Sequence, residues 1–137
     1  MEILGKQPST KGGLDGFTGD AWIDLIVSGE APSRVWVTVV RFAPGARMAW
    51  HAHALGQTLH VTEGLGWMQS RGGEVLEVRA GDTVRTPPGE WHWHGASPDH
   101  FMSHLAIWEA TPDGSGIDWG DHVADVEYAL QPTESHG

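Results

Sequence analysis

Residues 45–64 read GARMAWHAHALGQTLHVTEG, and residues 81–92 read GDTVRTPPGEWH. These two blocks contain four candidate metal donors: His51, His53, Gln57 and His92. Because side chains alternate between the two faces of a β-strand, the two histidines of the His-x-His pair point to the same side. Three imidazoles and an amide oxygen suit a divalent transition metal, so we predict a metal site rather than a group of merely core-packed histidines.

Gln57 sets the charge of this predicted site. Three neutral imidazoles and a neutral amide leave the +2 charge of a divalent ion uncompensated, whereas a carboxylate would reduce it to +1. Such an ion is a stronger Lewis acid and favours a bound alkoxide over its parent hydroxyl. The alternative is that Gln57 only forms local hydrogen bonds and that the ion has three histidine ligands.

Short segments rich in β-branched and aromatic residues, separated by Gly and Pro turns, make up most of the chain. They predict eight strands: Trp22–Val27, Arg34–Phe42, Gln57–Thr62, Gly66–Arg71, Glu74–Arg79, Thr83–Thr86, Trp91–Gly95 and Phe101–Trp108. Residues 121–130 have apolar side chains at three-and-four spacing, which predicts a short helical segment near the C-terminus. The predicted fold class is therefore all-β, a single-domain barrel or sandwich. We expect an N-terminal arm over 1–20, the barrel over 21–130 and a flexible tail over 131–137.

Composition excludes several functions. The chain has 137 residues and no Cys, which rules out disulfides, thiolate nucleophiles and sulfur-ligated metals. A formal net charge of -10 opposes binding to nucleic acid or to an anionic membrane face. There is no apolar run of the ~20 residues needed to span a bilayer and no signal-peptide pattern, so we expect a cytoplasmic protein.

Two further histidines are candidate acids or bases. His94 lies two residues beyond His92 and faces the same side of its strand, and His104 can join the pocket from the last strand. An imidazole can take and give a proton near neutral pH, although either residue could instead only orient a ligand. By the same alternation, Trp50, Trp91 and Trp93 should point away from the metal site.

The strand Arg34–Phe42 is apolar on both faces, with Val35, Val37 and Val39 on one side. A strand buried on both sides in a small barrel suggests that one face meets another subunit. We therefore expect a homo-oligomer, a dimer or a tetramer.

The spacings G-x5-H-x-H-x3-Q-x6-G and G-x5-P-x-G-x2-H resemble the two motifs of the cupin superfamily, in which Glu is more usual at the position of Gln57. This resemblance implies a jelly-roll β-barrel. The stretches FAPGARMAWHAHALGQTL, PGEWHWHGASP and MSHLAIWE resemble small bacterial cupins that include manganese-dependent (R)-selective hydroxynitrile lyases. In that subgroup Gln belongs to the ligand set, and the matching pocket positions are Thr38, Val40 and Trp108. The resemblance implies Mn2+ as cofactor, with Fe2+, Zn2+, Ni2+ or Co2+ as alternatives.

The implied activity is that of a lyase that cleaves or forms cyanohydrins, giving an aldehyde or ketone plus HCN. The metal would act as Lewis acid and His94 or His104 as acid/base, on a small neutral substrate. Because one barrel hosts unrelated chemistries, two alternatives stay open. One is a non-haem metal dioxygenase or related oxidoreductase, and the other is a non-catalytic small-molecule binding cupin. The sequence leaves open the native metal, the physiological substrate, the enantiopreference, the number of subunits and which of the two histidines is the base.

Overall fold

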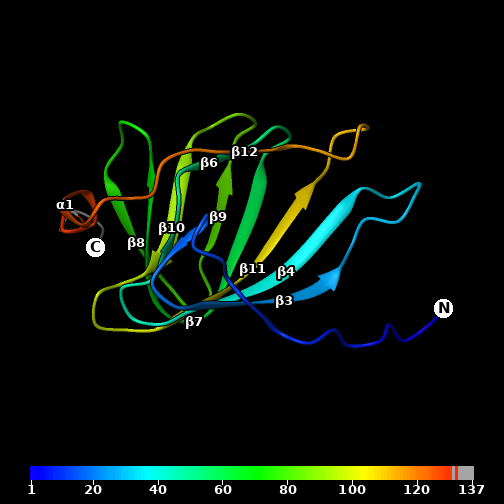
Figure 1. The fold of residues 1–137 in the computed structure, drawn as a ribbon, viewed down its shortest axis with the longest axis horizontal. Coiled ribbons are helices and arrows are strands. Elements are labelled where there is room, and N and C mark those ends of the chain that lie inside the picture. The colour runs from blue at the N-terminus through cyan, green and yellow to red at the C-terminus, as the bar shows by residue number, and fades with distance from the viewer. Residues whose placement is uncertain (131, 133–137) are drawn as a thin grey trace.

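The chain forms one long curled sheet of short and medium strands (Figure 1). The computed structural model describes residues 1–130 and 132. The strands are β1 (Thr10–Lys11), β2 (Phe17–Thr18), β3 (Ala21–Val27), β4 (Val35–Phe42), β5 (Arg47–Met48), β6 (His51–His53), β7 (Gln57–Ser70), β8 (Val75–Arg79), β9 (Thr83–Thr86), β10 (His92–Ala96), β11 (Met102–Glu109) and β12 (Ile117–Trp119). Helix α1 spans Asp125–Tyr128. This architecture confirms the predicted all-β fold with a short helical segment near the C-terminus.

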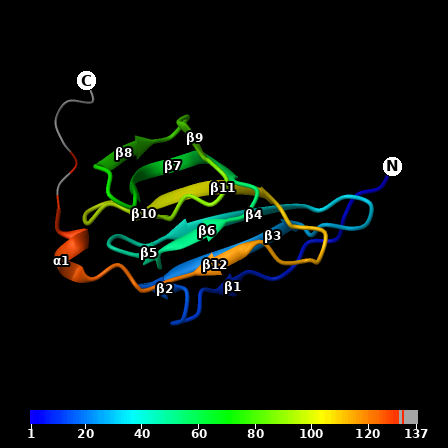
Figure 2. The same cartoon turned by 90° about the horizontal axis from the view of Figure 1, so that it is seen from above.

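Strand β7 belongs to both halves of the sheet. Its first part pairs with β11 and β9, and its second part pairs with β10 and β8. The first half continues through β4 and β3 to β1, and the second through β5 to β2. Strand β6 lies between β10 and β12. The sheet therefore curls around an interior (Figure 2), and buried side chains from both halves fill it.

The prediction of two separate strands over Gln57–Thr62 and Gly66–Arg71 was wrong. The structure has one strand of 14 residues across this region. Gly64 makes the continuity possible, because it adopts a φ of +81° and a Cβ there would lie 1.9 Å from the carbonyl oxygen of Phe101. The glycine therefore bends the strand from one half of the sheet to the other and does not end it. The other six predicted strands are present, with both ends within one residue of the prediction.

The two ends of the chain contain structure that the sequence did not reveal. Strands β1 and β2 lie within residues 1–20, and Phe17 of β2 is buried. Strand β12 follows β11 and pairs with β6. Helix α1 covers only four of the ten residues predicted as helical. Its N-terminus is capped by a hydrogen bond that the Ala124 backbone N–H donates to Glu127 Oε1. The predicted tail over 131–137 lies outside the described residues apart from Pro132.

Two groups of buried side chains hold the fold together. The larger one fills the interior of the curled sheet and includes Phe42, Leu59 and Met102. The second lies on the other side of β10 and is rich in tryptophan. Its members are Trp50, Trp67, Trp93, Val75, Val123 and Tyr128, with Trp91 packed against them. This confirms that Trp50, Trp91 and Trp93 point away from the interior, and Tyr128 of α1 packs against Trp67 and Trp93. Within the described part of the chain, no helix is long and apolar enough to cross a membrane.

Candidate metal centre

The three histidines of the two sequence blocks converge in the interior. His51 and His53 come from β6, and His92 lies directly opposite His51 on the neighbouring strand β10. All three are buried, and their ligand atoms lie within 4.8 Å of one another. Gln57, the first residue of β7, places its Oε1 3.2 Å from His92 Nε2. The four predicted donors therefore gather at one point, and the three histidines could hold a metal ion.

Backbone carbonyls orient two of these imidazoles. His51 Nδ1 donates to the Ala49 oxygen at 2.8 Å, and His92 Nδ1 donates to the Glu90 oxygen at 2.9 Å. In both rings the proton is thereby held on Nδ1, so that Nε2 is the unprotonated, ligating nitrogen. The loops that precede β6 and β10 thus fix the orientation of the donors.

Burial keeps the cluster neutral. Desolvation, with a smaller contribution from the neighbouring His92, lowers the pKa of His51 to about 3 and that of His53 to about 4. Desolvation also lowers the pKa of His92 below its ordinary value of 6.5. Since a metal binds the neutral imidazole, these side chains are ready for ligation at neutral pH.

His94 and His104 form a second pair beside the donors. His94 Nε2 lies 3.3 Å from His51 Nε2, and His94 Nδ1 lies 2.8 Å from His104 Nε2. Both rings are buried, and Phe42 packs against them with ring centroids 6.2 Å from His94 and 5.4 Å from His104. Desolvation lowers the pKa of His104 to about 4 and holds that of His94 well below 6.5. The order from the donors outward is therefore His51, His94, His104.

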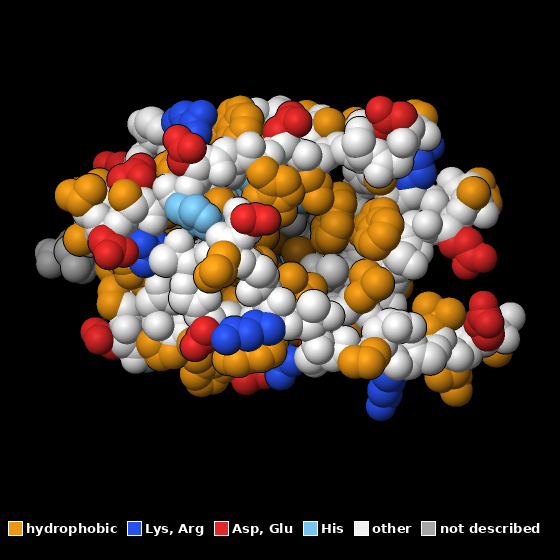
Figure 3. Space-filling view, viewed as in Figure 1, with side chains coloured by type: hydrophobic (Ala, Val, Ile, Leu, Met, Phe, Trp, Pro, Cys, Tyr) orange, Lys and Arg blue, Asp and Glu red, His pale blue; other side chains and the backbone are white. Residues whose placement is uncertain are grey.

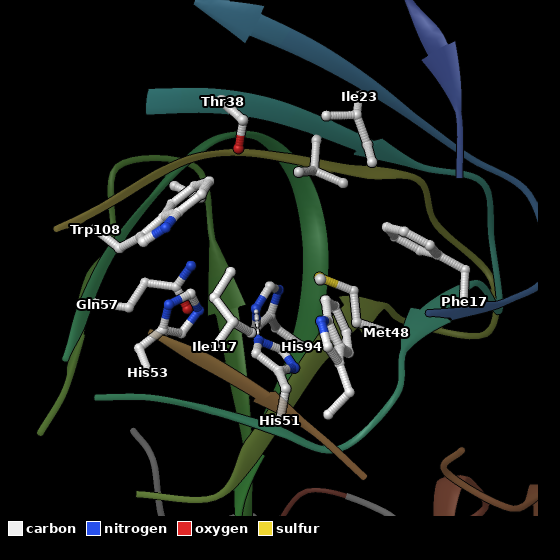
Figure 4. A pocket seen from close by; sticks show the side chains of 13 residues that line it. Phe17, Ile23, Thr38, Met48, His51, His53, Gln57, His94, Trp108 and Ile117 are labelled. Carbon is white, nitrogen blue, oxygen red and sulfur yellow. Dashed lines mark hydrogen bonds between the residues drawn. The ribbon is translucent and has the colours of Figure 1, made fainter. Parts of the chain in front are cut away.

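A cavity of about 150 Å³ opens on this cluster. Figure 3 shows a hollow rimmed mainly by hydrophobic side chains, and Figure 4 shows His51, His53, Gln57 and His94 on one of its walls. The three predicted pocket residues, Thr38, Val40 and Trp108, all line it, whereas His104 does not. None of the described lining residues is an Asp, Glu, Lys or Arg. The cavity therefore suits a small neutral molecule.

Six residues of the cavity wall were not predicted from the sequence. Two belong to β12, one belongs to β11, and three come from the N-terminal part of the sheet: Ile117, Trp119, Ala106, Phe17, Ile23 and Met48. Trp119 also lies over His51, with ring centroids 5.0 Å apart. The apolar-polar-apolar pattern of Ile117-Asp118-Trp119 is the one signal that could have indicated a strand with an inward face.

The donor set fits a divalent transition metal. It offers three neutral imidazole nitrogens and an amide oxygen, and carbonyl acceptors fix two of the rings in the ligating tautomer. His53 Nδ1 is a buried nitrogen without a hydrogen-bond partner in the described structure, and such an atom is costly unless it binds something. The residues present thus match the ion that the fold suggests, without deciding which metal it is.

The fold and the motifs are shared with known proteins. A model of the cupin domain matches residues 38–107. The chain belongs to the cupin family. This cupin is 52% identical over 130 residues to an (R)-mandelonitrile lyase from Granulicella tundricola, and the match covers 93% of this chain and 98% of that protein.

Two solved structures superpose on most of the chain. A cupin-like protein from Thermotoga maritima is 37% identical, with a TM-score of 0.83, and the match covers 93% of this chain and 95% of that one. A polyketide cyclase from Streptomyces resistomycificus is 18% identical with a TM-score of 0.69, covering 93% and 90% of the two chains. The second likeness shows the fold alone, since the same barrel serves different chemistries.

Proposed function

We propose that this cupin is a metal-dependent hydroxynitrile lyase, which cleaves cyanohydrins to an aldehyde or ketone and HCN, or forms them in reverse. The observation that carries the proposal is the position of His94, whose Nε2 lies 3.3 Å from His51 Nε2 beside a cavity without charged lining residues. The relative named (R)-mandelonitrile lyase, 52% identical over nearly its whole length, supports the same reaction.

His51, His53, Gln57 and His92 would hold the metal, with Mn2+ as the proposed ion. A divalent ion in this site supplies Lewis acidity toward a substrate oxygen and lowers the pKa of a hydroxyl group. The chain's own contribution is to keep three imidazoles neutral and to hold Nε2 of His51 and His92 free through their Nδ1 hydrogen bonds. The apolar cavity wall excludes bulk water from the same region.

His94 is the proposed acid/base, and His104 positions it. In cleavage, His94 Nε2 accepts the hydroxyl proton while the electrons of the carbon–carbon bond leave with cyanide. His94 then returns this proton to cyanide, so that HCN departs and the imidazole is neutral again. The 2.8 Å contact between His94 Nδ1 and His104 Nε2 holds the ring in place for both transfers. Because His104 does not line the cavity, it acts through His94 and not on the substrate.

Replacing the two histidines separately tests these roles. With His94→Ala we expect at least a hundredfold loss of kcat with full metal content, as measured by cyanide release and by elemental analysis. His104→Gln, which keeps a polar partner for His94, should lose much less activity than His104→Leu. Equal activity of His94→Ala and the parent protein would contradict the assignment. Oxygen consumption without carbonyl release would favour the dioxygenase instead.

Two copies of this chain are further proposed to associate through the outer face of β3, β4 and β11. Ile26, Val35 and Ile107 are 48%, 38% and 38% exposed on this face. Its charges are paired, as in the contact between Arg41 and Asp24 at 3.1 Å. In a chain with a net charge of -10, an apolar and locally neutral face lets two copies meet without electrostatic repulsion.

A further inference from the structure

Two stacked tryptophans, Trp108 and Trp36, lie between the metal-centre cavity and a second cleft. Trp108, near the end of β11, lines the cavity and lies beside His53, with ring centroids 5.6 Å apart. Figure 4 shows it at one end of the cavity, next to Gln57 and His53, with Phe17 at the opposite end. The position of the Trp108 indole therefore sets how far the cavity extends at the end near Gln57 and His53.

A second indole supports Trp108 from the side away from the metal centre. Trp36 lies directly opposite Trp108 in the register of β4 and β11, and their rings stack at 6.1 Å with an interplanar angle of 14°. Trp36 does not line the cavity; it lines the outer cleft. Trp36 thus stands between Trp108 and the space into which Trp108 would otherwise turn.

The outer cleft is large and lies between two loops. The β3–β4 loop and the β11–β12 loop project from the end of the sheet opposite α1, as Figures 1 and 2 show. The cleft between them has a volume of about 490 Å³, against about 150 Å³ for the cavity. Arg34 lines the cleft and is held in place, because its Nε donates to the Ala110 oxygen at 3.0 Å and its Nη2 pairs with Glu109 at 2.9 Å. The Trp36–Trp108 stack therefore lies between the cavity and a cleft whose Arg34 side is fixed.

We propose that Trp36 is a positioning residue that sets the upper size limit of the substrate. By stacking on Trp108, it holds the Trp108 indole between the cavity and the outer cleft. The inference rests on the proposed lyase function for the identity of the substrate, and it assigns to that function short aliphatic cyanohydrins. Loss of the Trp36 indole frees Trp108 to turn outward and joins the cavity to the cleft. Longer substituents then fit in the joined space.

Ligand binding tests the proposal without turnover. The Mn2+-loaded protein is titrated with linear nitriles from propionitrile to octanenitrile, and apparent dissociation constants are taken from the rise in Tm. In the parent protein the affinity should rise about fourfold per added methylene up to the limit of the cavity and then stop rising. With Trp36→Ala it should continue to rise for at least two more carbons, an improvement of about sixteenfold or more for the longest chains.

Three further variants separate positioning from general damage. Trp36→Phe keeps a flat ring and should restore the parent limit, and Trp36→Leu serves if the alanine variant does not fold. Trp22→Ala removes a tryptophan from the neighbouring strand β3, where its side chain is 38% exposed, and should leave the length profile unchanged. An unchanged length profile in both Trp36→Ala and Trp36→Leu would overturn the proposal.

Turnover of short and long aliphatic cyanohydrins gives a second reading. If the chain is a lyase, Trp36→Ala should raise the ratio of kcat/KM for long over short substrates at least tenfold, mainly through KM. If Trp36→Ala extends the chain-length dependence of nitrile affinity but no variant cleaves a cyanohydrin, the lyase function is rejected and the positioning role of Trp36 is retained. Turnover with an unshifted profile would keep the lyase and reject the role of Trp36.

Discussion

Acid should destabilise the metal-free protein steeply between pH 6.5 and about 4. Burial lowers the pKa of His51 to about 3, those of His53 and His104 to about 4, and that of His94 well below its ordinary value, whereas the histidines of the unfolded chain titrate near 6.5. In this window the unfolded chain binds protons that the folded chain does not bind. The stability is therefore fully present above pH 6.5 and decreases as the pH falls.

The slope of the free energy of unfolding against pH follows from the number of buried histidines. One such histidine contributes about 1.4 kcal/mol per pH unit to the free energy of unfolding, so the four together contribute about 5–6 kcal/mol per unit. A domain of ordinary stability, ~5–15 kcal/mol, would lose much of it within two pH units. Urea denaturation of the chelator-treated protein at several pH values between 7 and 5, followed by circular dichroism, measures this slope.

Two variants test the origin of the slope. His104→Leu removes one of four buried imidazoles and should reduce the slope by about a quarter, or about 1.4 kcal/mol per pH unit. His60→Gln removes an imidazole that lies outside the cluster, bonded to Thr83 Oγ1, and is the matched control variant. A parent slope no steeper than that of one histidine would refute the buried neutral cluster.

Other changes have equally defined outcomes. Gln57→Glu should retain the metal and lower kcat about tenfold or more, because a carboxylate reduces the net charge of the centre. Elemental analysis measures the metal content, and cyanide release measures kcat. An undiminished kcat would argue against Gln57 as a ligand. Arg47→Met should cost about 2–4 kcal/mol in urea unfolding, since the buried guanidinium donates to the Val123 oxygen at 2.7 Å, whereas Asp125→Asn, on the exposed partner, should cost less than about 1 kcal/mol. Ile107→Glu should lower the molecular mass in sedimentation by disrupting the proposed interface, while Val126→Glu on α1 should not; a parent protein that is monomeric at tens of micromolar would exclude that interface.

The parts of the site that depend on local pattern could be predicted from the sequence. Strand alternation alone places His51 and His53 on one face and turns Trp50 to the other, and the structure has both arrangements. Glycine and proline spacing gave the limits of six strands to within one residue, because such turns leave a strong local signal.

Features that depend on distant pairing could not be predicted in this way. Strand β12 pairs with β6, which lies more than sixty residues away in the chain. The three residues of β12 carry no signal of which strand they pair with. Alternation also placed His104 on the inward face without showing its depth, so the sequence could not tell that His94 lies between it and the donors. The gap predicted between Gln57–Thr62 and Gly66–Arg71 is absent, because the bend at Gly64 lets one strand continue where the Phe101 carbonyl packs closely against it.

Metal-dependent cleavage of a cyanohydrin is the most direct test of the proposed function. Racemic mandelonitrile and a short aliphatic cyanohydrin are incubated with Mn2+-loaded protein, metal-stripped protein and the variant His51→Ala, and cyanide release is followed. The account predicts turnover only in the loaded parent protein, with the short aliphatic substrate preferred. Absence of turnover on both substrates, in protein shown to hold one Mn2+ per chain, would contradict it.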